Sequence, residues 1–358
     1  MTVVATFEVG YSQFIGPAGQ AAKPLPDHFG DLAVLATLYR AMVRTRGFDA
    51  KAIALQRTGR LGTYASSLGQ EAVAVGVATA MRPEDIFLPS FREHGAQLWR
   101  GARPEEILLY WGGDERGNSF AAAPHDFPNC VPVGSHAPHA VGIALALKLR
   151  REPRVAVCVF GDGATSKGDV AEALNIAGVW RLPAVFVVAN NAWAISVPRA
   201  RQSAAQTLAQ KSVAAGIPGE HVDGNDVVAV AAAVGEAIER ARAGGGPSLV
   251  EAVTYRLGDH TTADDAGRYR DDSEVTRHWP EEPLLRLRHF LTERGAWTKD
   301  DEEKLLQECA AEMDAAADRY LATPPQDPDT IFDFTFARSP ADIEAQRSEP
   351  PRFAERAR

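Results

Sequence analysis

The run from Arg154 to Pro198 constrains the fold of this chain more than any other stretch. Residues 154–160 form an unbroken apolar and β-branched stretch, which is typical of a strand covered on both faces in a parallel sheet. A second stretch of this kind covers residues 184–189 and follows Pro183. We expect a helix between them, so the run predicts one right-handed βαβ unit.

The elements that follow the first strand can be placed from capping and periodicity. The helix of the unit is expected to begin near Asp169, with Glu172 three residues further on in a capping-box-like arrangement. Helical structure is also expected over 204–215, followed by a turn over 222–226. The residues expected on the buried face of the first helix are Ala173, Ile176, Ala177 and Trp180.

Oxygen-bearing side chains follow both strands of the unit. Asp162 lies in Gly161-Asp162-Gly163 after the first strand, and Asn191 follows the second. Open α/β sheets bind ligands at the carboxyl ends of such strands. Two hard oxygen ligands beside glycines suit Mg²⁺ shared with a phosphate-bearing cofactor, whereas either dipeptide alone marks an ordinary turn. The chain contains neither G-x-G-x-x-G nor G-x-x-x-x-G-K-[ST].

The GDG segment and the later Asn-Asn pair together resemble the thiamin diphosphate signature of decarboxylases, transketolases and 2-oxo acid dehydrogenases. The resemblance implies thiamin diphosphate and Mg²⁺ as cofactors. It implies that the metal is held by Asp162, the side chain of Asn191 and the main-chain carbonyl of Trp193. The residues of this unit that it places at the cofactor are Gly161, Asp162, Gly163, Ala164 and Asn191.

The segment F-R-E-H-G, residues 91–95, narrows the resemblance. It is similar to the [YF]-R-x-H-G segment in the α subunit of the thiamin-dependent decarboxylating component of 2-oxo acid dehydrogenase complexes. This similarity implies that Phe91 and Arg92 contact the diphosphate, and arginine can bind a phosphate through two parallel hydrogen bonds. The alternative is a surface arginine paired with Glu93. V-D-G-N-D-V and A-Q-K-S-V-A-A-G-I-P-G also resemble these α subunits, so the match extends from about residue 30 to about residue 290.

Two loops complete the expected site. Residues 130–138 resemble the family segment whose main chain, here near Val131 and Val133, meets the aminopyrimidine ring. Many relatives have glutamine at His136, which we expect to be a polar lining residue, the alternative being an added proton donor. In the second loop His260 follows a strand end, where nearby carboxylates are expected to set its tautomer and raise its basicity.

His260 could be a structural residue, as a lone histidine usually is. The family resemblance instead implies a catalytic histidine in a loop that covers the mouth of the site. We therefore expect His260 to donate a proton or to contact phosphate. Thr261 occupies the place of a hydroxyl that is phosphorylated in some members, but a hydroxyl alone does not predict regulation.

The composition excludes several classes of partner. The net charge is −9 and no long basic run occurs, so neither nucleic acid nor a membrane surface is an expected partner. The sequence shows no basic region followed by an apolar stretch at its start, and its three cysteines lie far apart. We expect a cytoplasmic protein.

The domain organisation follows from length and apolar content. Of the 358 residues, 45% are hydrophobic, enough to bury a large core. We expect an extended arm over 1–30, the diphosphate- and Mg²⁺-binding half of a thiamin diphosphate-binding fold over 31–323, and a C-terminal arm over 324–358. The fold class is α/β, with a doubly wound, mostly parallel sheet and helical N- and C-terminal extensions.

The chemistry of thiamin diphosphate needs a carboxylate at the aminopyrimidine ring, and the chain leaves no room for a second domain to supply it. The resemblance implies that a β subunit does so in an α2β2 heterotetramer, and that the acyl group passes to a lipoyl group of an acyltransferase. Pyruvate is the first expected substrate, because F-R-E-H-G and A-I-S-V-P-R are most similar to pyruvate dehydrogenase α subunits. The alternatives are a branched-chain 2-oxo acid dehydrogenase, an acetoin dehydrogenase and a non-catalytic scaffold paralogue.

Overall fold

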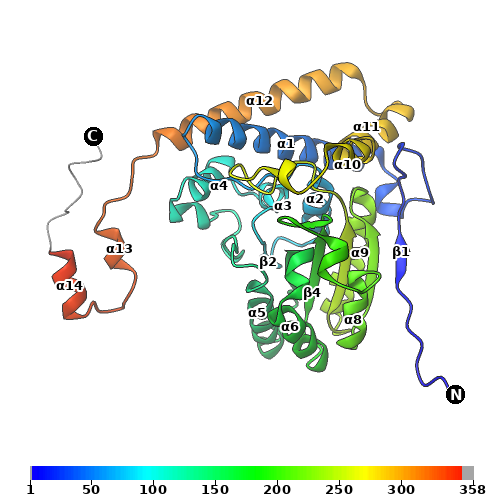
Figure 1. Ribbon diagram of the computed structural model, residues 1–358, viewed down its shortest axis with the longest axis horizontal. Helices are drawn as coiled ribbons and strands as arrows, with labels where there is room; N and C mark the ends of the chain where they lie inside the picture. Colours follow the sequence, from blue (N-terminus) through cyan, green and yellow to red (C-terminus); the bar gives the residue numbers. More distant parts are fainter. Residues whose placement is uncertain (1, 349–358) are drawn as a thin grey trace. The chain divides into compact units, whose positions relative to one another are not determined.

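The computed structural model describes residues 2–348, and the chain divides after Tyr320 into a large first unit and a small second unit. The first unit is built on an all-parallel sheet with the strand order β1-β7-β8-β4-β3-β2 (Figure 1). Its strands are β1 (Gly10–Ser12), β2 (Ile86–Leu88), β3 (Ala156–Gly161), β4 (Ala184–Asn190), β7 (Gly219–Asp223) and β8 (Ser248–Val253). The hairpin β5 (Trp193–Ala194) and β6 (Val197–Pro198) is separate. The expected α/β class is confirmed.

Helices cover the sheet and extend the first unit. They are α1 (Leu32–Arg57), α2 (Glu71–Ala80), α3 (His94–Trp99), α4 (Pro104–Trp111), α5 (His136–Arg150), α6 (Gly168–Val179), α7 (Arg199–Gln202), α8 (Lys211–Ala214), α9 (Val227–Arg242), α10 (Asp272–His278), α11 (Pro283–Glu293) and α12 (Lys299–Ala322). Short 3₁₀ helices cover Asp27–Phe29, Glu115–Asn118, Asp162–Ser166, Leu208–Gln210, Ala266–Arg268 and Trp279–Glu281. The second unit contains α13 (Thr330–Asp333) and α14 (Ala341–Arg347).

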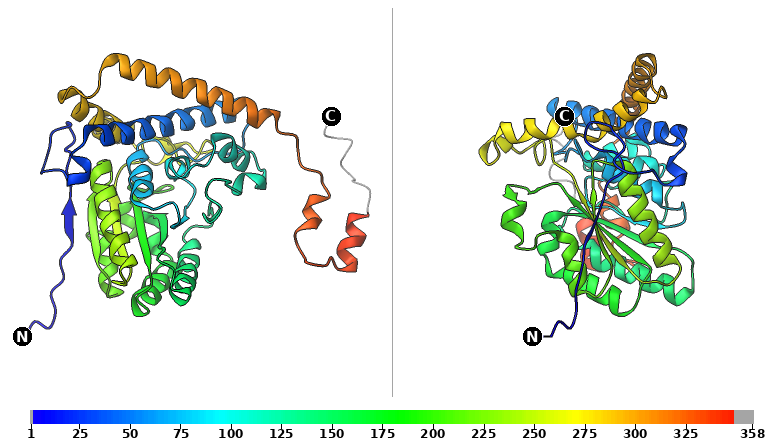
Figure 2. Two further views of the ribbon diagram at one scale, coloured as in Figure 1. Left: turned by 180° about the vertical axis from the view of Figure 1, so that it is seen from behind. Right: turned by 90° about the vertical axis from the view of Figure 1, so that its right-hand side faces the viewer.

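The strand side chains alternate between two cores, as period-2 geometry requires. Val157 and Val187 pack into the core shared with α2 and α9, whereas Phe160 and Phe186 pack into the core shared with α5 and α6. The two helix layers on opposite faces of the sheet can be followed in Figure 2. Because both faces are covered, β3 and β4 are apolar along nearly their whole length, as expected.

The expected buried face of α6 is only half correct. Ala173 and Ala177 are buried, but Ile176 is 37% and Trp180 50% exposed. The stripe that packs against the sheet is Val170, Ala173, Leu174 and Ala177, which follows i, i+3, i+4, i+7. The helix begins at Gly168, and the residue before it, Lys167, makes no side-chain cap, so the expected capping-box-like arrangement of Asp169 and Glu172 is not formed.

Two other local expectations also change. Residues 222–226 are not only a turn, because β7 runs through Val222 and Asp223 and pairs with both β1 and β8. Helical structure expected over 204–215 is restricted to Leu208–Gln210 and α8. β7 carries polar residues on a half-exposed strand, so it lacks the apolar run that marks a buried strand.

The segment 1–30, expected as an extended arm, contributes the edge strand β1 to the sheet. Just after this strand, the main-chain N–H groups of Phe14 and Ile15 donate hydrogen bonds to the Asp226 carboxylate, at 2.6 and 2.8 Å. The first unit ends at Tyr320. Within residues 2–348, every helix is too short or too polar to span a lipid bilayer.

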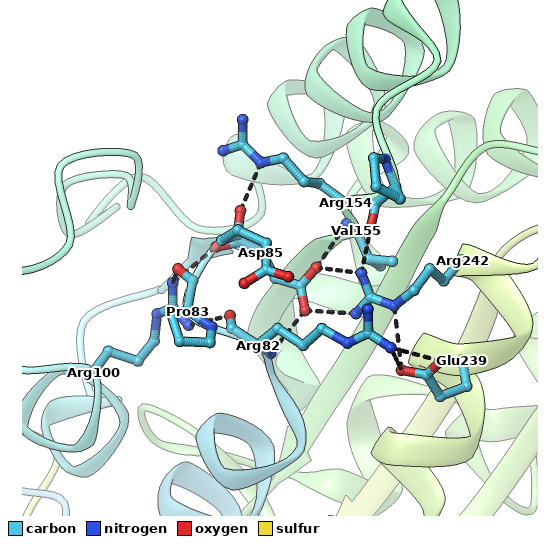
Figure 3. A network of polar contacts seen from close by, with 10 residues as sticks. Arg82, Pro83, Asp85, Arg100, Arg154, Val155, Glu239 and Arg242 are labelled. Atoms are coloured by element: carbon cyan, nitrogen blue, oxygen red, sulfur yellow. Dashed lines mark hydrogen bonds and ion pairs between the residues drawn. The ribbon is translucent and has the colours of Figure 1, made fainter.

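A buried polar network ties the amino-terminal edge of the sheet together (Figure 3). Asp85, just before β2, accepts the N–H groups of Arg82 at 2.9 Å and of Val155 at 2.9 Å. Both terminal nitrogens of the Arg242 guanidinium donate to the same carboxylate, at 3.0 and 2.8 Å. This network lies at the opposite end of the strands from the site described below.

Candidate active site

The carboxyl ends of β3 and β4 place the expected residues around one cavity of about 200 Å³. Gly161 of β3 pairs with Ala189 of β4, so Asp162 and Asn191 leave the sheet at nearly the same level. The expected residues that line the cavity are Phe91, Arg92, Val133, Gly161, Asp162, Gly163, Ala164, Asn191, Trp193 and His260. Val131 is not among the lining residues and is 52% exposed.

Asp162 is a buried acid, and among residues 2–348 no cationic side chain donates a hydrogen bond to it. Its side chain accepts a hydrogen bond of 2.6 Å from the amide nitrogen of Gln202, which is a neutral donor. Burial raises the pKa of Asp162, and the bond from Gln202 only partly opposes this. A divalent cation beside the carboxylate would remove the penalty of burying its charge.

The main chain around Asn191 is held in a tight turn. The Asn191 amide group donates to the side-chain oxygen of Gln70 at 2.9 Å, and its oxygen accepts the N–H of Trp193 at 3.2 Å. Ala192 and Ile195 have φ angles of 71° and 55°, a left-handed conformation that is unfavourable for residues other than glycine. These two residues adopt this conformation where the chain turns back and passes over the end of β3.

Gly163 permits that close approach. A Cβ atom at Gly163 would lie 2.6 Å from the Cβ of Ala194. No group of three or more His, Cys, Asp or Glu side chains in residues 2–348 could hold a metal by itself. A metal ion at this edge would therefore need oxygen ligands from another molecule in addition to those of the protein, as Mg²⁺ commonly has with phosphates.

Two buried arginines lie at the site. Arg92 lines the cavity, whereas Arg256 is not among the lining residues and donates to the Trp193 carbonyl at 3.4 Å. Arg92 is 7% exposed, and its guanidinium donates to the Ser66 carbonyl at 2.5 Å and to the His260 carbonyl at 2.6 Å. It is not the surface arginine paired with Glu93 that was the alternative. Glu93 accepts instead from the Ser90 hydroxyl at 2.8 Å and from the Arg92 main-chain N–H at 3.3 Å.

Arg256 was missed by the sequence reasoning. It is 1% exposed and donates to the Ile195 carbonyl at 2.9 Å and to the Tyr269 hydroxyl at 2.8 Å. A guanidinium buried to this degree beside a second one is costly unless an anion joins them. The available signal was an arginine in the apolar stretch that leaves β8.

His260 lies between the two guanidinium groups. Its Nδ1 atom is 2.8 Å from one terminal nitrogen of Arg92 and 3.4 Å from one of Arg256. Nδ1 must accept from Arg92, so the neutral ring carries its proton on Nε2. Phe91 packs edge-on against the ring at 6.1 Å between centroids.

The basicity of His260 is the reverse of the expectation. Burial and the two arginines lower the pKa of His260 to about 4. Asp264 does not contact the ring but accepts the His260 main-chain N–H at 2.9 Å. Burial, together with the charge of Arg256, also lowers the pKa of Arg92 to about 10. The imidazole is therefore neutral at pH 7, in a positive field that an incoming anion would relieve.

His136 lines the same cavity and is 2% exposed. Its Nε2 donates to the Val159 carbonyl at 2.7 Å, and burial lowers the pKa of the ring. This arrangement suits a neutral polar lining residue, the role that we expect for it.

The chain is similar to known proteins over most of its length. Residues 39–329 match the family described as "Dehydrogenase E1 component". The chain is 42% identical to the 3-methyl-2-oxobutanoate dehydrogenase subunit alpha of Mycobacterium tuberculosis (strain ATCC 25618 / H37Rv), over 94% of this chain and 92% of the relative. It is 39% identical to the pyruvate dehydrogenase E1 component subunit alpha of Acholeplasma laidlawii, over 90% and 94% of the two chains. It is 40% identical to the subunit of that name in Staphylococcus aureus (strain N315), over 87% and 85%. The chain belongs to the dehydrogenase E1 component family, the thiamin diphosphate-dependent 2-oxo acid dehydrogenases.

Proposed function

We propose that this chain is the α subunit of a 2-oxo acid dehydrogenase that decarboxylates its substrate and transfers the acyl group to a lipoyl group. The observation that carries the proposal is a group of buried charges without ion pairs at one edge of the sheet. Among residues 2–348, the Asp162 carboxylate and the Arg92 guanidinium line the cavity without a salt-bridge partner, and the buried Arg256 guanidinium nearby also makes no salt bridge. A metal ion bound to a diphosphate supplies both missing charges.

The residues of the site divide into a group that would bind the metal and a group that would bind the diphosphate. Asp162, Asn191 and the Trp193 carbonyl would hold Mg²⁺. The diphosphate would be held by Phe91, Arg92, Arg256 and His260, with close main-chain approach at Gly161, Gly163 and Ala164. When bound, thiamin diphosphate supplies the electron sink on which a 2-oxo acid can lose CO₂.

His260 is placed to handle a proton at this site. Arg92 contacts only the Nδ1 atom of the ring, so the N–H group at Nε2 can donate a hydrogen bond to substrate or phosphate. As the diphosphate charge offsets Arg92 and Arg256, the pKa of the ring would rise from about 4 toward its ordinary value. The residue would thereby become a better proton acceptor only when the cofactor is in place.

α subunits of the pyruvate dehydrogenase family work with a β subunit within a complex. We propose an α2β2 heterotetramer here, in which the β subunit supplies the carboxylate for the aminopyrimidine ring. Apolar side chains near the mouth of the cavity support this proposal, because Val131, Val133 and Ile195 are all about half exposed in the single chain. The main chain at Val131 and Val133 would meet the ring at this edge, and the lipoyl acyltransferase would receive the acyl group.

Pyruvate and 3-methyl-2-oxobutanoate are the two candidate substrates. Pyruvate is favoured by F-R-E-H-G and A-I-S-V-P-R, and by the names of two relatives. The branched-chain acid is favoured by the relative with 42% identity. We place pyruvate first, and acetoin is a third candidate from the same enzyme class.

The test is a comparison of kcat/KM for pyruvate, 3-methyl-2-oxobutanoate and acetoin. The chain is co-expressed with its β-type partner, and acylation of a lipoyl domain and release of CO₂ are followed together. A preference for one 2-oxo acid, with both signals, supports the proposal and identifies the substrate. A preference for acetoin selects that dehydrogenase instead. A complex that binds the cofactor and turns over none of the three is the scaffold paralogue.

A further inference from the structure

The segment 62–70 has no helix or strand, yet it contacts two polar residues of the proposed cofactor site, Arg92 and Asn191. The Ser66 carbonyl accepts from Arg92 at 2.5 Å, and the Gln70 side chain accepts from Asn191 at 2.9 Å. The segment also pairs with the loop that carries His260. The Tyr64 N–H donates to the Thr262 hydroxyl at 3.0 Å, and the Thr262 N–H donates to the Tyr64 carbonyl at 2.8 Å.

One carboxylate on α1 holds this segment. Asp49 is 2% exposed, and its Oδ1 accepts from the Tyr64 hydroxyl at 2.8 Å and from the Ser67 N–H at 2.7 Å. Its Oδ2 accepts from the Ser66 hydroxyl at 2.7 Å. Among the described residues, the groups that donate hydrogen bonds to Asp49 are all neutral and all come from residues 64–67. The carboxylate therefore holds residues 64–67 of this irregular segment in one conformation.

We infer that Asp49 is a positioning residue for both Arg92 and the His260 loop. It does not line the cavity. It acts on Arg92 through the Ser66 carbonyl, which accepts a hydrogen bond from the Arg92 guanidinium. It acts on the His260 loop through the main chain of Tyr64, which is hydrogen-bonded to Thr262, two residues beyond His260. This inference rests on the proposed function of the site as a diphosphate site, and it adds a residue on α1 to that function.

Geometry explains why this carboxylate is suited to the task. A segment without regular structure has few main-chain bonds of its own, and its conformation is selected by the groups that satisfy its donors. Asp49 satisfies donors from Tyr64, Ser66 and Ser67 at once, and the rigid helix α1 holds it in place. When it is replaced by a side chain with one acceptor, at least one of these donors is left buried and unpaired.

The test uses the full chain in complex with its β subunit, and it compares Asp49→Asn with Asp85→Asn. Asp85 is the matched control, since it is an equally buried acid that holds main-chain N–H groups at the opposite edge of the sheet (Figure 3). Two quantities are measured. One is the hydrogen-exchange rate of the Tyr64 and Thr262 amides without cofactor. The other is the affinity for thiamin diphosphate with Mg²⁺ by calorimetry.

We expect Asp49→Asn to accelerate both exchange rates and to weaken cofactor binding, each by about 10–100-fold, as is typical for the loss of a group that orients a ligand-binding residue. Asp85→Asn is expected to lower the melting temperature but to leave both quantities within about twofold of wild type. Equal effects of the two variants, or an unchanged affinity in Asp49→Asn, would overturn the inference.

Two milder variants cover the case in which Asp49→Asn does not fold. Ser66→Ala removes one donor to Asp49 but keeps the carbonyl that Arg92 uses, and we expect about fivefold weaker cofactor binding. Thr262→Val removes the acceptor for Tyr64 only, so the Tyr64 amide should exchange faster while the amide of residue 262 stays protected. Wild-type affinity in the first variant, or no change in exchange in the second, contradicts the inference. If the wild-type complex binds no thiamin diphosphate, the proposed function fails, whereas the exchange rates still decide the role of Asp49.

Discussion

Replacement of Arg256 by methionine separates the binding role of this residue from its effect on stability. Burial and Arg256 lower the pKa of Arg92 to about 10, which corresponds to a cost of roughly 3 kcal/mol for keeping its charge buried. Burial contributes the largest part of this cost and Arg256 the next. Arg256→Met removes the repulsion and the cost of burying a second charge, which is several kcal/mol per ion. It also removes the bonds to the Ile195 carbonyl and the Tyr269 hydroxyl, each with a net contribution of about 1.5–3 kcal/mol. We therefore expect the free energy of unfolding to change by no more than about 2 kcal/mol.

Arg256→Met should weaken the binding of thiamin diphosphate far more than it changes the free energy of unfolding. Loss of a buried charge partner typically costs about 3–5 kcal/mol, so the affinity for thiamin diphosphate should fall by roughly two to three and a half orders of magnitude. Calorimetry on the α/β complex measures this change, and an NMR titration of His260 should show its pKa rising from about 4, because one of the two cations that lower it is gone. Arg242→Met is the control, since this arginine belongs to the Asp85 network at the far edge of the sheet. A loss of less than about tenfold, or an equal loss in the control, would refute the reasoning.

Three further predictions concern single residues. Asp162→Ala should weaken Mg²⁺-dependent cofactor binding by roughly two to three and a half orders of magnitude, measured by calorimetry, and near-normal affinity would exclude Asp162 from the metal site. His260 has a folded pKa of about 4, below the ordinary 6.5, so the unfolded state takes up its proton first as the pH falls. Wild type should lose stability between pH 6.5 and pH 4 relative to His260→Asn in urea titrations, and parallel curves would contradict this. Gly69 has a φ angle of +89°, and a Cβ there would lie 2.5 Å from the Tyr255 carbonyl oxygen, so Gly69→Ala should lower the free energy of unfolding by more than about 2 kcal/mol. Gly59 also has a positive φ angle but no atom within 4 Å of a Cβ, so Gly59→Ala should lower it by only about 1 kcal/mol in the same urea titrations.

The parts of the site that could be predicted are those set by short-range patterns. Two apolar stretches separated by a helix fix β3 and β4 as parallel neighbours, so Asp162 and Asn191 had to lie at one edge. The expectation for α6 shows the limit of this reasoning. The spacing of small residues, and not the size of Ile176 and Trp180, decides which face packs against the sheet.

The remaining features depend on residues distant in sequence. The basicity of His260 was wrongly expected to be raised because carboxylates are its neighbours in the chain, whereas its neighbours in space are two arginines. One of them, Arg92, is 168 positions away. Arg256 and Asp49 carry no motif of their own, and their roles appear only when burial and hydrogen-bond partners are known.

The central claim is that this chain provides the metal and diphosphate half of a shared cofactor site. The most direct measurement is a calorimetric titration of thiamin diphosphate, with and without Mg²⁺, into the chain alone and into the chain co-expressed with its β-type subunit. The account predicts tight binding that requires Mg²⁺ and that appears only in the complex. Absence of binding in the complex, or binding that is indifferent to Mg²⁺, would contradict it.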